Sequence, residues 1–496
     1  MAGVVPESAL QGSPKAWLLA WATAGLVGCA GLPTAAPPDP VPGPPVPATW
    51  SGDTHSPAPA QPLAAWWRRF DDPLLVELVD QALRANTSVR SAQAALAQAR
   101  ALVQVQQAGL APSLDGSASA QRNRNGNAGS SNSFKAGLDA AWSPDVFGSQ
   151  RAAIAAAEAS ARASAATLGD TQVSVTSEVA LGYLGLRSNQ ARLAIAEQNL
   201  ASQEETLQIT QWRQQAGLLS TLEVEQARSA TEQTRAALPG LRSARDQAVH
   251  ALAVLTGRPL AELTPLLASI RDVPQAPPDL ALALPAETLR QRADVQAAEQ
   301  QVAAAWARAT QANAARLPSF RLGGSLGLSA LSLGALSTGG AVMAALLGSV
   351  SMPLFDGGAA NAQLRAQQAA LEQSRAAYQA VVLGALQEVE DALVALREDK
   401  ARATSLQTAA ESAASAALLA RQRFASGLVD FQTVLDTQRS QLGTQDSLAQ
   451  ARASIAADHV RLYKALGGGW QAGDETAPTA TPAADAIAAK PRITTP

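Results

Sequence analysis

The chain has 496 residues, a net charge of −3 and only 16% charged residues. This balance excludes the dense basic surface of a nucleic-acid-binding protein, and a single cysteine excludes a disulfide within the chain. Aromatic residues make up only 4% of the sequence, which favours alanine-rich helices packed through small side chains over an ordinary globular core.

Residues 1–28 have the features of a lipoprotein signal peptide. Lys15 precedes a short apolar run that ends at Cys29, the only cysteine. The tetrad Leu26-Val27-Gly28-Cys29 matches the bacterial lipobox, in which the cysteine becomes the lipidated first residue of the mature protein. Cys29 is therefore the predicted lipidation site, and several acyl chains would give lasting membrane attachment. Ala30, in place of an aspartate, indicates sorting to the outer membrane. The alternative is a short signal followed by an incidental cysteine.

Residues 29–65 are rich in proline, alanine and glycine and are predicted to form a lipidated tether. Residues 471–496 are rich in alanine, threonine and proline and are predicted to be a disordered tail. Beyond the N-terminal run no stretch of about eighteen apolar residues occurs, so no transmembrane helix is expected.

Two runs, Ser149–Gln215 and Gly357–Phe424, predict unusually long helices. The second contains no proline and is rich in alanine, glutamine, leucine and glutamate. Its apolar residues recur every three or four positions, as in a coiled-coil seam: Tyr378, Val382, Leu386, Val389, Leu393 and Leu396. A helix over this run would be roughly 100 Å long, which is more than an ordinary domain uses.

The two long runs belong to an internal duplication with a period of roughly 206–210 residues. Each run follows a phenylalanine and a glycine, closes at Gly217 or Gly427, and is followed by a further helical run that ends near Gly257 or Gly467. The predicted division is a first repeat over 66–257, a connecting segment over 258–285 and a second repeat over 286–470.

Four segments of period two precede the long runs in pairs. They lie near residues 113–120, 134–142, 319–328 and 342–352, and the loops 123–132 and 329–340 join them as hairpins. Alternating segments of about ten residues are typical of transmembrane β-strands; the alternative is a soluble sheet packed on the helices. Four strands cannot close a barrel, and open edges in lipid would leave backbone groups unsatisfied. A membrane location therefore requires several chains to share one barrel, with the long helices forming a second, helical barrel.

The sequence resembles the TolC family of outer-membrane efflux proteins, in its NodT-type lipoprotein branch. The resemblance covers residues 66–470 and rests on the lipobox, the duplication and three motifs: Pro353-Leu-Phe-Asp-Gly-Gly358, Leu289-Arg-Gln-Arg-Ala-Asp-Val295 and Val434-Leu-Asp-Thr-Gln-Arg439. Ala293 departs from the family, which usually has proline there, and Asp294 remains as a candidate helix cap.

The resemblance implies an α+β, mostly α fold, with coiled-coil helical hairpins in an α-barrel and four strands per chain in a shared twelve-stranded β-barrel. It implies a homotrimer in the outer membrane that acts as the exit duct of a tripartite efflux system. The implied partners are a periplasmic adaptor and an inner-membrane transporter of the RND type. A lipid-anchored periplasmic coiled-coil scaffold, metal efflux and type I protein secretion remain as alternatives.

No catalytic, cofactor-binding or metal-binding constellation is present, so an enzyme is not expected. His55, His250 and His459 lack metal-ligand spacing and are expected on solvated faces. Trp142, Phe147, Phe320 and Phe355 lie near predicted strand ends, where interface anchoring and ordinary packing are equally good explanations.

The turns after the long helices supply the gate candidates Glu223, Asp430 and Asp436. Ser220-Thr-Leu-Glu223 is a capping box and Asp430 is a good N-cap, so capping is the favoured role of these two acids. Asp436 lies inside the following helix, where no cap is needed. In the family, an aspartate matching this position helps to form the constriction at the periplasmic tip; the alternative is a solvated helix face.

Overall fold

The computed structural model describes residues 46–47, 49–50, 63–124, 130–277, 285–337 and 339–471. The predicted signal peptide, Cys29, and nearly all of the predicted tether and tail lie outside these residues. The described chain forms two compact units. Residues 98–161 and 300–376 make up the first, here called the sheet unit, and the other described residues make up the helical unit.

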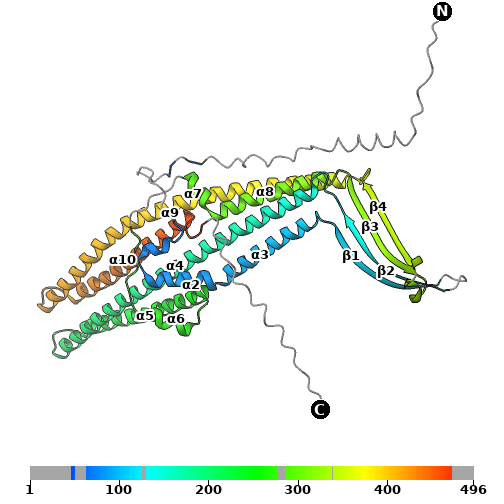
Figure 1. Cartoon of the computed structure of the whole chain (residues 1–496). Helices are drawn as coiled ribbons and strands as arrows, with labels where there is room; N and C mark the ends of the chain where they lie inside the picture. Colours follow the sequence, from blue (N-terminus) through cyan, green and yellow to red (C-terminus); the bar gives the residue numbers. More distant parts are fainter. Residues whose placement is uncertain are drawn as a thin grey trace, which may run out of the picture. The chain divides into compact units, whose positions relative to one another are not determined.

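The sheet unit contains all four predicted strands, which lie side by side in Figure 1. They are β1 (Ser113–Arg124), β2 (Ser130–Trp142), β3 (Ser319–Ala330) and β4 (Val342–Ser351), in one antiparallel sheet of order β1-β2-β3-β4. Both predicted hairpins are confirmed. The second loop also contains two short 3-10 turns, η3 (Leu333–Ser337) and η4 (Gly339–Ala341), which its glycine- and serine-rich sequence did not reveal.

In β1, β2 and β3 the strand register separates an apolar face of the sheet from a polar one, whereas β4 also places Met343 and Leu347 on the polar face. Leu138 pairs with Gly116 on one side and Leu326 on the other, whereas Lys135 pairs with Ser119 and Ser329. Because neighbouring side chains point to opposite faces, these pairs lie on opposite sides of the sheet. None of the strand residues is fully buried. The alternative of a sheet packed on helices is therefore wrong for the single chain.

Gly137 and Gly327 face each other across β2 and β3 on the polar face. A Cβ atom added to Gly327 would lie 2.8 Å from the carbonyl oxygen of Ala136, and one added to Gly137 would lie 3.1 Å from that of Leu326. Only glycine permits strands to approach this closely.

The predicted long helices are α4 (Ser149–Gln215) and α9 (Ala359–Ala425), each of 67 residues. The start of α9 lies beyond the predicted Gly357, because Gly357 and Gly358 both have positive φ angles, 65° and 90°. The Asp356 carboxylate accepts hydrogen bonds from the amides of Gly358 and Ala360, each at 2.8 Å. Among the described helices, none combines the length and the apolar character that crossing a membrane requires.

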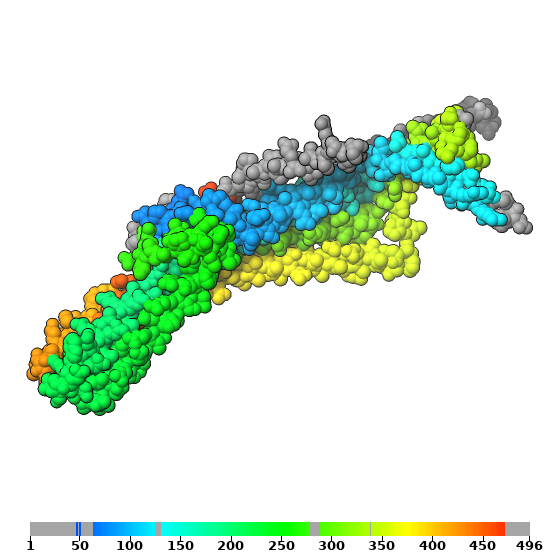
Figure 2. Space-filling view, turned by 90° about the horizontal axis from the view of Figure 1, so that it is seen from below, coloured from blue at the N-terminus to red at the C-terminus, as the bar shows by residue number. Residues whose placement is uncertain are grey.

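Shorter helices complete the two repeats, and α3 and α8 precede the two hairpins. Their bounds are η1 (Trp66–Phe70), α2 (Pro73–Ala85), α3 (Thr87–Ala108), α5 (Thr221–Thr256), α6 (Leu260–Leu267), α7 (Pro285–Gln291), α8 (Ala293–Ala314) and α10 (Phe431–Ala465). In the helical unit, α2 packs against α5 and α5 against α6 (Figure 2). The helical runs predicted to end near Gly257 and Gly467 are confirmed as α5 and α10.

The core of the helical unit gathers several of the chain's few aromatic rings. Trp66 stacks on Tyr463 with 5.3 Å between ring centroids, and Trp67 and Phe70 lie edge-on to Trp66. Half of the predicted seam of α9 is buried, with Val382 and Val389 nearly inaccessible, and the other half is partly buried. Small side chains therefore pack the long helices, while aromatic rings fill the junction of η1 with α10.

A buried polar network in the helical unit ties α4 to the start of α2. The Tyr183 hydroxyl donates to the Asp72 carboxylate at 2.6 Å and accepts from the Arg187 guanidinium at 3.0 Å. Arg187 also donates to the Ser269 carbonyl oxygen at 2.5 Å, in the segment after α6. Burial, followed by the bond to Asp72, raises the pKa of Tyr183 to about 12, so the hydroxyl keeps its proton.

The duplication is visible in two matching joints. The Asn86 side chain accepts from the amides of Ser88 and Val89 at the start of α3, and its Nδ2 donates to the Leu255 carbonyl oxygen at 2.9 Å. Arg292 occupies the matching position before α8, and its guanidinium donates to the Ala465 carbonyl oxygen at 2.9 Å. Each joint thus connects the last helix of a repeat to the helix that precedes its hairpin, once through a neutral amide and once through a charged group.

The prediction that Asp294 caps α8 is wrong. Because α8 begins at Ala293, the cap position belongs to Arg292, and Asp294 lies inside the first turn. Its carboxylate accepts two hydrogen bonds from Arg292, at 3.0 and 2.6 Å. The guanidinium also donates to Glu388 of α9 at 2.8 Å. The charged Arg292 therefore pairs with two carboxylates, whereas the neutral Asn86 at the matching position of the first repeat requires none.

Candidate functional site: the paired helical turns

The turns between α4 and α5 and between α9 and α10 lie side by side in the helical unit (Figures 1 and 2). Gly217 and Gly427 follow the two long helices with φ angles of 75° and 74°. The next residues, Leu218 and Leu428, return their amides to carbonyl oxygens of the last helical turn, at 2.8 and 2.9 Å. Both turns are glycine C-caps, because glycine adopts this left-handed conformation without steric cost.

The predicted caps at the starts of α5 and α10 are confirmed. Ser220 and Glu223 form the reciprocal capping box, with the Glu223 carboxylate 3.0 Å from the Ser220 amide. The Asp430 carboxylate accepts from the amide of Thr433 at 2.9 Å and from its hydroxyl group. The hydrogen bond from the Ser220 side chain lowers the pKa of Glu223, and that from the Thr433 side chain lowers the pKa of Asp430. Asp430 is exposed and Glu223 is partly exposed, and a role for them in a constriction stays a prediction.

Asp436 lies inside α10, about one and a half turns beyond Asp430. Its side chain is 54% exposed and accepts from Gln432 at 3.0 Å and from Arg439 at 3.3 Å. Within one chain the carboxylate therefore lies on a solvated face beside a cation. Its role as a gate also stays a prediction.

Arg213 joins the two turns, a role that the sequence did not indicate. Its guanidinium donates to the carbonyl oxygens of Phe424 and Ala425, at 3.2 and 3.1 Å, and lies 4.9 Å from the centroid of the Phe424 ring. These carbonyl groups lack partners within α9, and a cation is favourable at a helix C-terminus. The sequence shows a basic residue four positions before each turn glycine in both repeats. It does not show which helix that residue contacts.

Three leucines in or beside the paired turns have exposed side chains. Leu218, Leu222 and Leu428 are 72%, 64% and 74% exposed. Large apolar side chains grouped on an exposed surface indicate a protein contact. The turns therefore combine a capped backbone with exposed apolar side chains.

The four aromatic residues near the strand ends have different environments. Trp142 donates from its indole nitrogen to the Leu110 carbonyl oxygen at 2.9 Å, and Phe147 packs on Phe320 with 6.3 Å between centroids. Phe355 is 92% exposed. Packing therefore accounts for Phe147 and Phe320, and Phe355 remains a candidate interface anchor.

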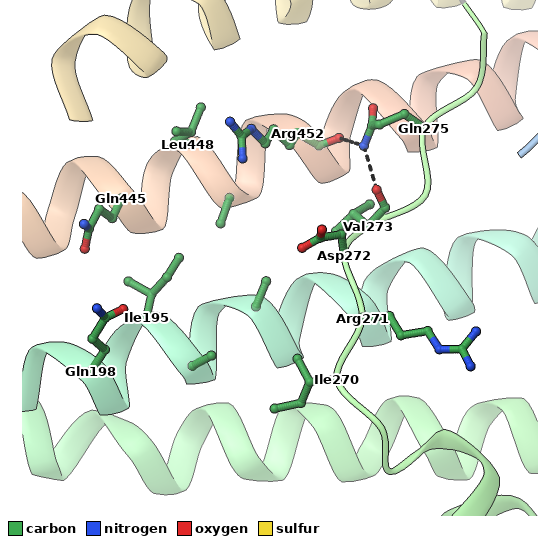
Figure 3. A pocket seen from close by; sticks show the side chains of 13 residues that line it. Ile195, Gln198, Ile270, Arg271, Asp272, Val273, Gln275, Gln445, Leu448 and Arg452 are labelled. Atoms are coloured by element: carbon green, nitrogen blue, oxygen red, sulfur yellow. Dashed lines mark hydrogen bonds between the residues drawn. The ribbon is translucent and has the colours of Figure 1, made fainter. Parts of the chain in front are cut away.

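A cavity of about 650 Å³ opens in the helical unit between α4, α10 and the segment after α6 (Figure 3). The Gln275 amide closes one side of it by donating to the carbonyl oxygens of Val273 and Arg452, each at 3.2 Å. Ile195, Ile270 and Leu448 contribute apolar surface. The connecting segment has no periodicity, so the sequence did not predict this cavity.

Within the described residues, no group of three histidine, cysteine, aspartate or glutamate side chains is placed to hold a metal ion. His459 is buried, contrary to the solvated face expected for it, and its Nδ1 lies 2.8 Å from the Ile455 carbonyl oxygen. Burial lowers its pKa, which keeps the ring neutral at pH 7. His250 is exposed on α5 as expected, and His55 lies outside the described residues.

Long paired helical hairpins joined to four antiparallel strands with an exposed apolar face define the class of outer-membrane channels. The chain belongs to the outer membrane efflux protein family, whose model matches residues 78–258 and 284–468. The resemblance drawn from the sequence is thereby confirmed, together with the fold class and an outer-membrane efflux function.

Individual relatives match over most of their length. The pyoverdine export outer membrane protein OpmQ of Pseudomonas putida is 32% identical over 442 residues, which cover 87% of this chain and 93% of OpmQ. The toluene efflux pump outer membrane protein TtgF of P. putida is 30% identical over 425 residues, 84% and 88% of the two chains. The solved outer-membrane channel OprN is 34% identical with a TM-score of 0.81, covering 88% of this chain and 99% of OprN.

Proposed function

We propose that three copies of this chain form one exit duct of a tripartite efflux system, with a shared twelve-stranded barrel in the outer membrane and a helical tunnel beneath it. The observation that carries this proposal is the sheet itself. β1 and β4 each pair on one side only, and an unpaired strand edge is costly in lipid. Pairing β1 of one copy with β4 of the next satisfies every edge, and three copies of four strands exceed the minimum of about eight for a closed barrel.

The faces of the sheet support the orientation of this barrel. Apolar side chains on one face would meet lipid, and the serines, glycines and charged residues of the other face would line the lumen. The glycines at positions 137 and 327 lie on the polar face, which would line the lumen, where side chains would crowd as the sheet curves into a barrel. Lipidation at Cys29 would add an anchor to the same membrane.

The paired turns are the proposed docking surface for a periplasmic adaptor, which would connect the duct to an inner-membrane transporter. Leu218, Leu222 and Leu428 provide apolar contact, and the capped turns present it without a large ordering cost. The duct performs no catalysis in this proposal. Substrate choice belongs to the transporter, because relatives of similar identity are named for pyoverdine and for toluene.

Mass measurement of the detergent-purified full-length protein, combined with planar-bilayer recording, tests the proposal. The expected result is a trimer with mixed strand and helix signals in circular dichroism and with discrete conductance steps. A monomer that stays soluble without detergent and gives no conductance would instead support the periplasmic scaffold.

A further inference from the structure

The apolar face of the sheet changes character along β1. From Leu114 to Ala120 its residues are leucine, glycine and alanine, but the last two residues on that face are Arg122 and Arg124. Arg122 pairs with Asn132 of β2, and Arg124 pairs with Ser130. Paired residues share a face, so both arginines lie on the apolar side of the sheet and at its loop end.

Aromatic residues mark both ends of the apolar band. Phe134 lies toward the loops and Trp142 lies toward the helices, both on the same face. Aromatic residues typically border the apolar band of a membrane barrel. At about 3.3 Å per residue, the cross-strand partners of Arg122 and Arg124 lie roughly 7 and 13 Å beyond Phe134. The two arginines therefore lie just outside the band, at the depth of lipid headgroups.

The loop end of the sheet has no acidic residue to neutralise these charges. Neither loop, 125–129 or 331–341, contains an aspartate or a glutamate, and β2 has none before Asp139. Arg122 makes a long contact to the Ser130 hydroxyl oxygen at 3.4 Å, and within the described strands neither guanidinium forms an ion pair. This edge is consequently cationic and open toward the side of the sheet that the proposed function turns to lipid.

We propose that Arg122 and Arg124 bind the phosphate groups of phosphorylated glycolipid headgroups in the outer leaflet. The inference rests on the proposed function, which places the apolar face in lipid and the loops outside. A guanidinium matches a phosphate group with two parallel hydrogen bonds, and the stems of the side chains reach from the apolar band to the headgroup layer. With three chains in a barrel, the arginines form three such sites around its outer rim.

Titration of the detergent-purified full-length protein with bis-phosphorylated lipid A, read by native mass spectrometry, tests the inference. Because one cation near a charged lipid surface contributes about 1 kcal/mol, R122Q and R124Q should each weaken binding about 5-fold, and the double variant roughly 30-fold. The matched control is K135Q. Lys135 lies next to Phe134 but on the opposite face, so its loss should leave binding within about twofold.

The double substitution to lysine keeps the charge without the two-pronged geometry and should bind more weakly than wild type but more tightly than the glutamine pair. Equal binding by wild type and the glutamine pair, in preparations that form conducting trimers, would overturn the lipid site and leave the proposed function intact. Failure of the wild-type protein to form trimers or conductance would overturn the proposed function itself. An equal loss in K135Q would also count against the inference, because it would assign the effect to net charge.

Discussion

At the scale of single residues, Asp430 and Asp436 have different structural roles, although the sequence made both of them gate candidates. Asp430 is a confirmed N-cap, whereas Asp436 contributes neither a cap nor a core contact and pairs only with exposed side chains. In a closed ring of three chains, Asp436 would appear three times around one axis and would attract cations. Arg439, one turn further along α10, would oppose that field.

D436A is therefore expected to leave the free energy of unfolding nearly unchanged, to raise conductance and to reduce cation preference in planar bilayers. R439Q should change cation preference in the opposite direction. D430A should mainly cost helix stability, about 0.5–2 kcal/mol. Wild-type conductance and selectivity in D436A would place the constriction elsewhere.

Asp170 gives the helical unit a pH dependence. Burial raises the pKa of its carboxyl, the nearby Asp294 adds to this rise, and Lys464 and Arg292 oppose it. A carboxyl with a raised pKa binds its proton more tightly in the folded state. The favourable contribution of Asp170 to the free energy of unfolding is therefore present below the unfolded pKa. It is lost as pH rises through the folded pKa.

D170N should accordingly raise the unfolding temperature at pH 7 relative to wild type, and the difference should shrink as pH falls toward 4. Thermal unfolding followed by circular dichroism between pH 4 and 8 measures this. An unchanged difference across that range would show that the substitution acts through packing. E223Q, at a partly exposed cap with a lowered pKa, is the control, because it should show no such gain at pH 7.

At the scale of elements, the contact of β2 with β3 is the most constrained part of the sheet. Substituting G327A would place a methyl group 2.8 Å from the Ala136 carbonyl oxygen, so one strand must shift. G323A is a matched control on the same strand and face, because its nearest neighbour would be 3.9 Å away. G327A is therefore expected to disturb the register between β2 and β3, and through it the closure of a barrel.

We expect G327A to lower the yield of trimer extracted from membranes several-fold while G323A assembles like wild type. Semi-native gel electrophoresis of heated and unheated samples provides the measurement. Equal trimer yields for the two variants would show that the sheet accommodates the added methyl group.

At the scale of the whole molecule, the exposed leucines of the paired turns link the duct to its transport pathway. L218D combined with L428D places charges on the apolar surface without removing a cap or a core side chain. The channel should conduct normally in bilayers, but efflux should fail in cells that depend on this duct, because the adaptor contact is lost. The minimal inhibitory concentration of an exported compound measures the failure.

L354D is the control for that experiment, since Leu354 is also highly exposed, at 93%, but lies in the sheet unit, beside α9 in the sequence. Full efflux by the variant with L218D and L428D would show that the turns are not the docking surface. Loss of bilayer conductance would instead show that the leucines support the fold.

The sequence by itself determined the features that depend on local periodicity and turn chemistry. The period-two segments became the four strands, the seam spacing became α9, and the glycines and capping residues placed the ends of the long helices within a few residues. These features depend on interactions between residues that are close together in the sequence, so the sequence alone predicts them. The duplication and the family motifs then indicated the class of protein, an outer-membrane efflux protein.

Tertiary structure decided which distant groups meet. Arg213 reaches carbonyl groups of the other long helix, Arg292 displaces Asp294 from the expected cap, and His459 is buried where a solvated face was expected. The pairing of β1 with β2 also places Arg122 and Arg124 on the apolar side beyond Phe134. Each result depends on packing between segments far apart in the sequence, where burial and hydrogen-bond partners outweigh local preference.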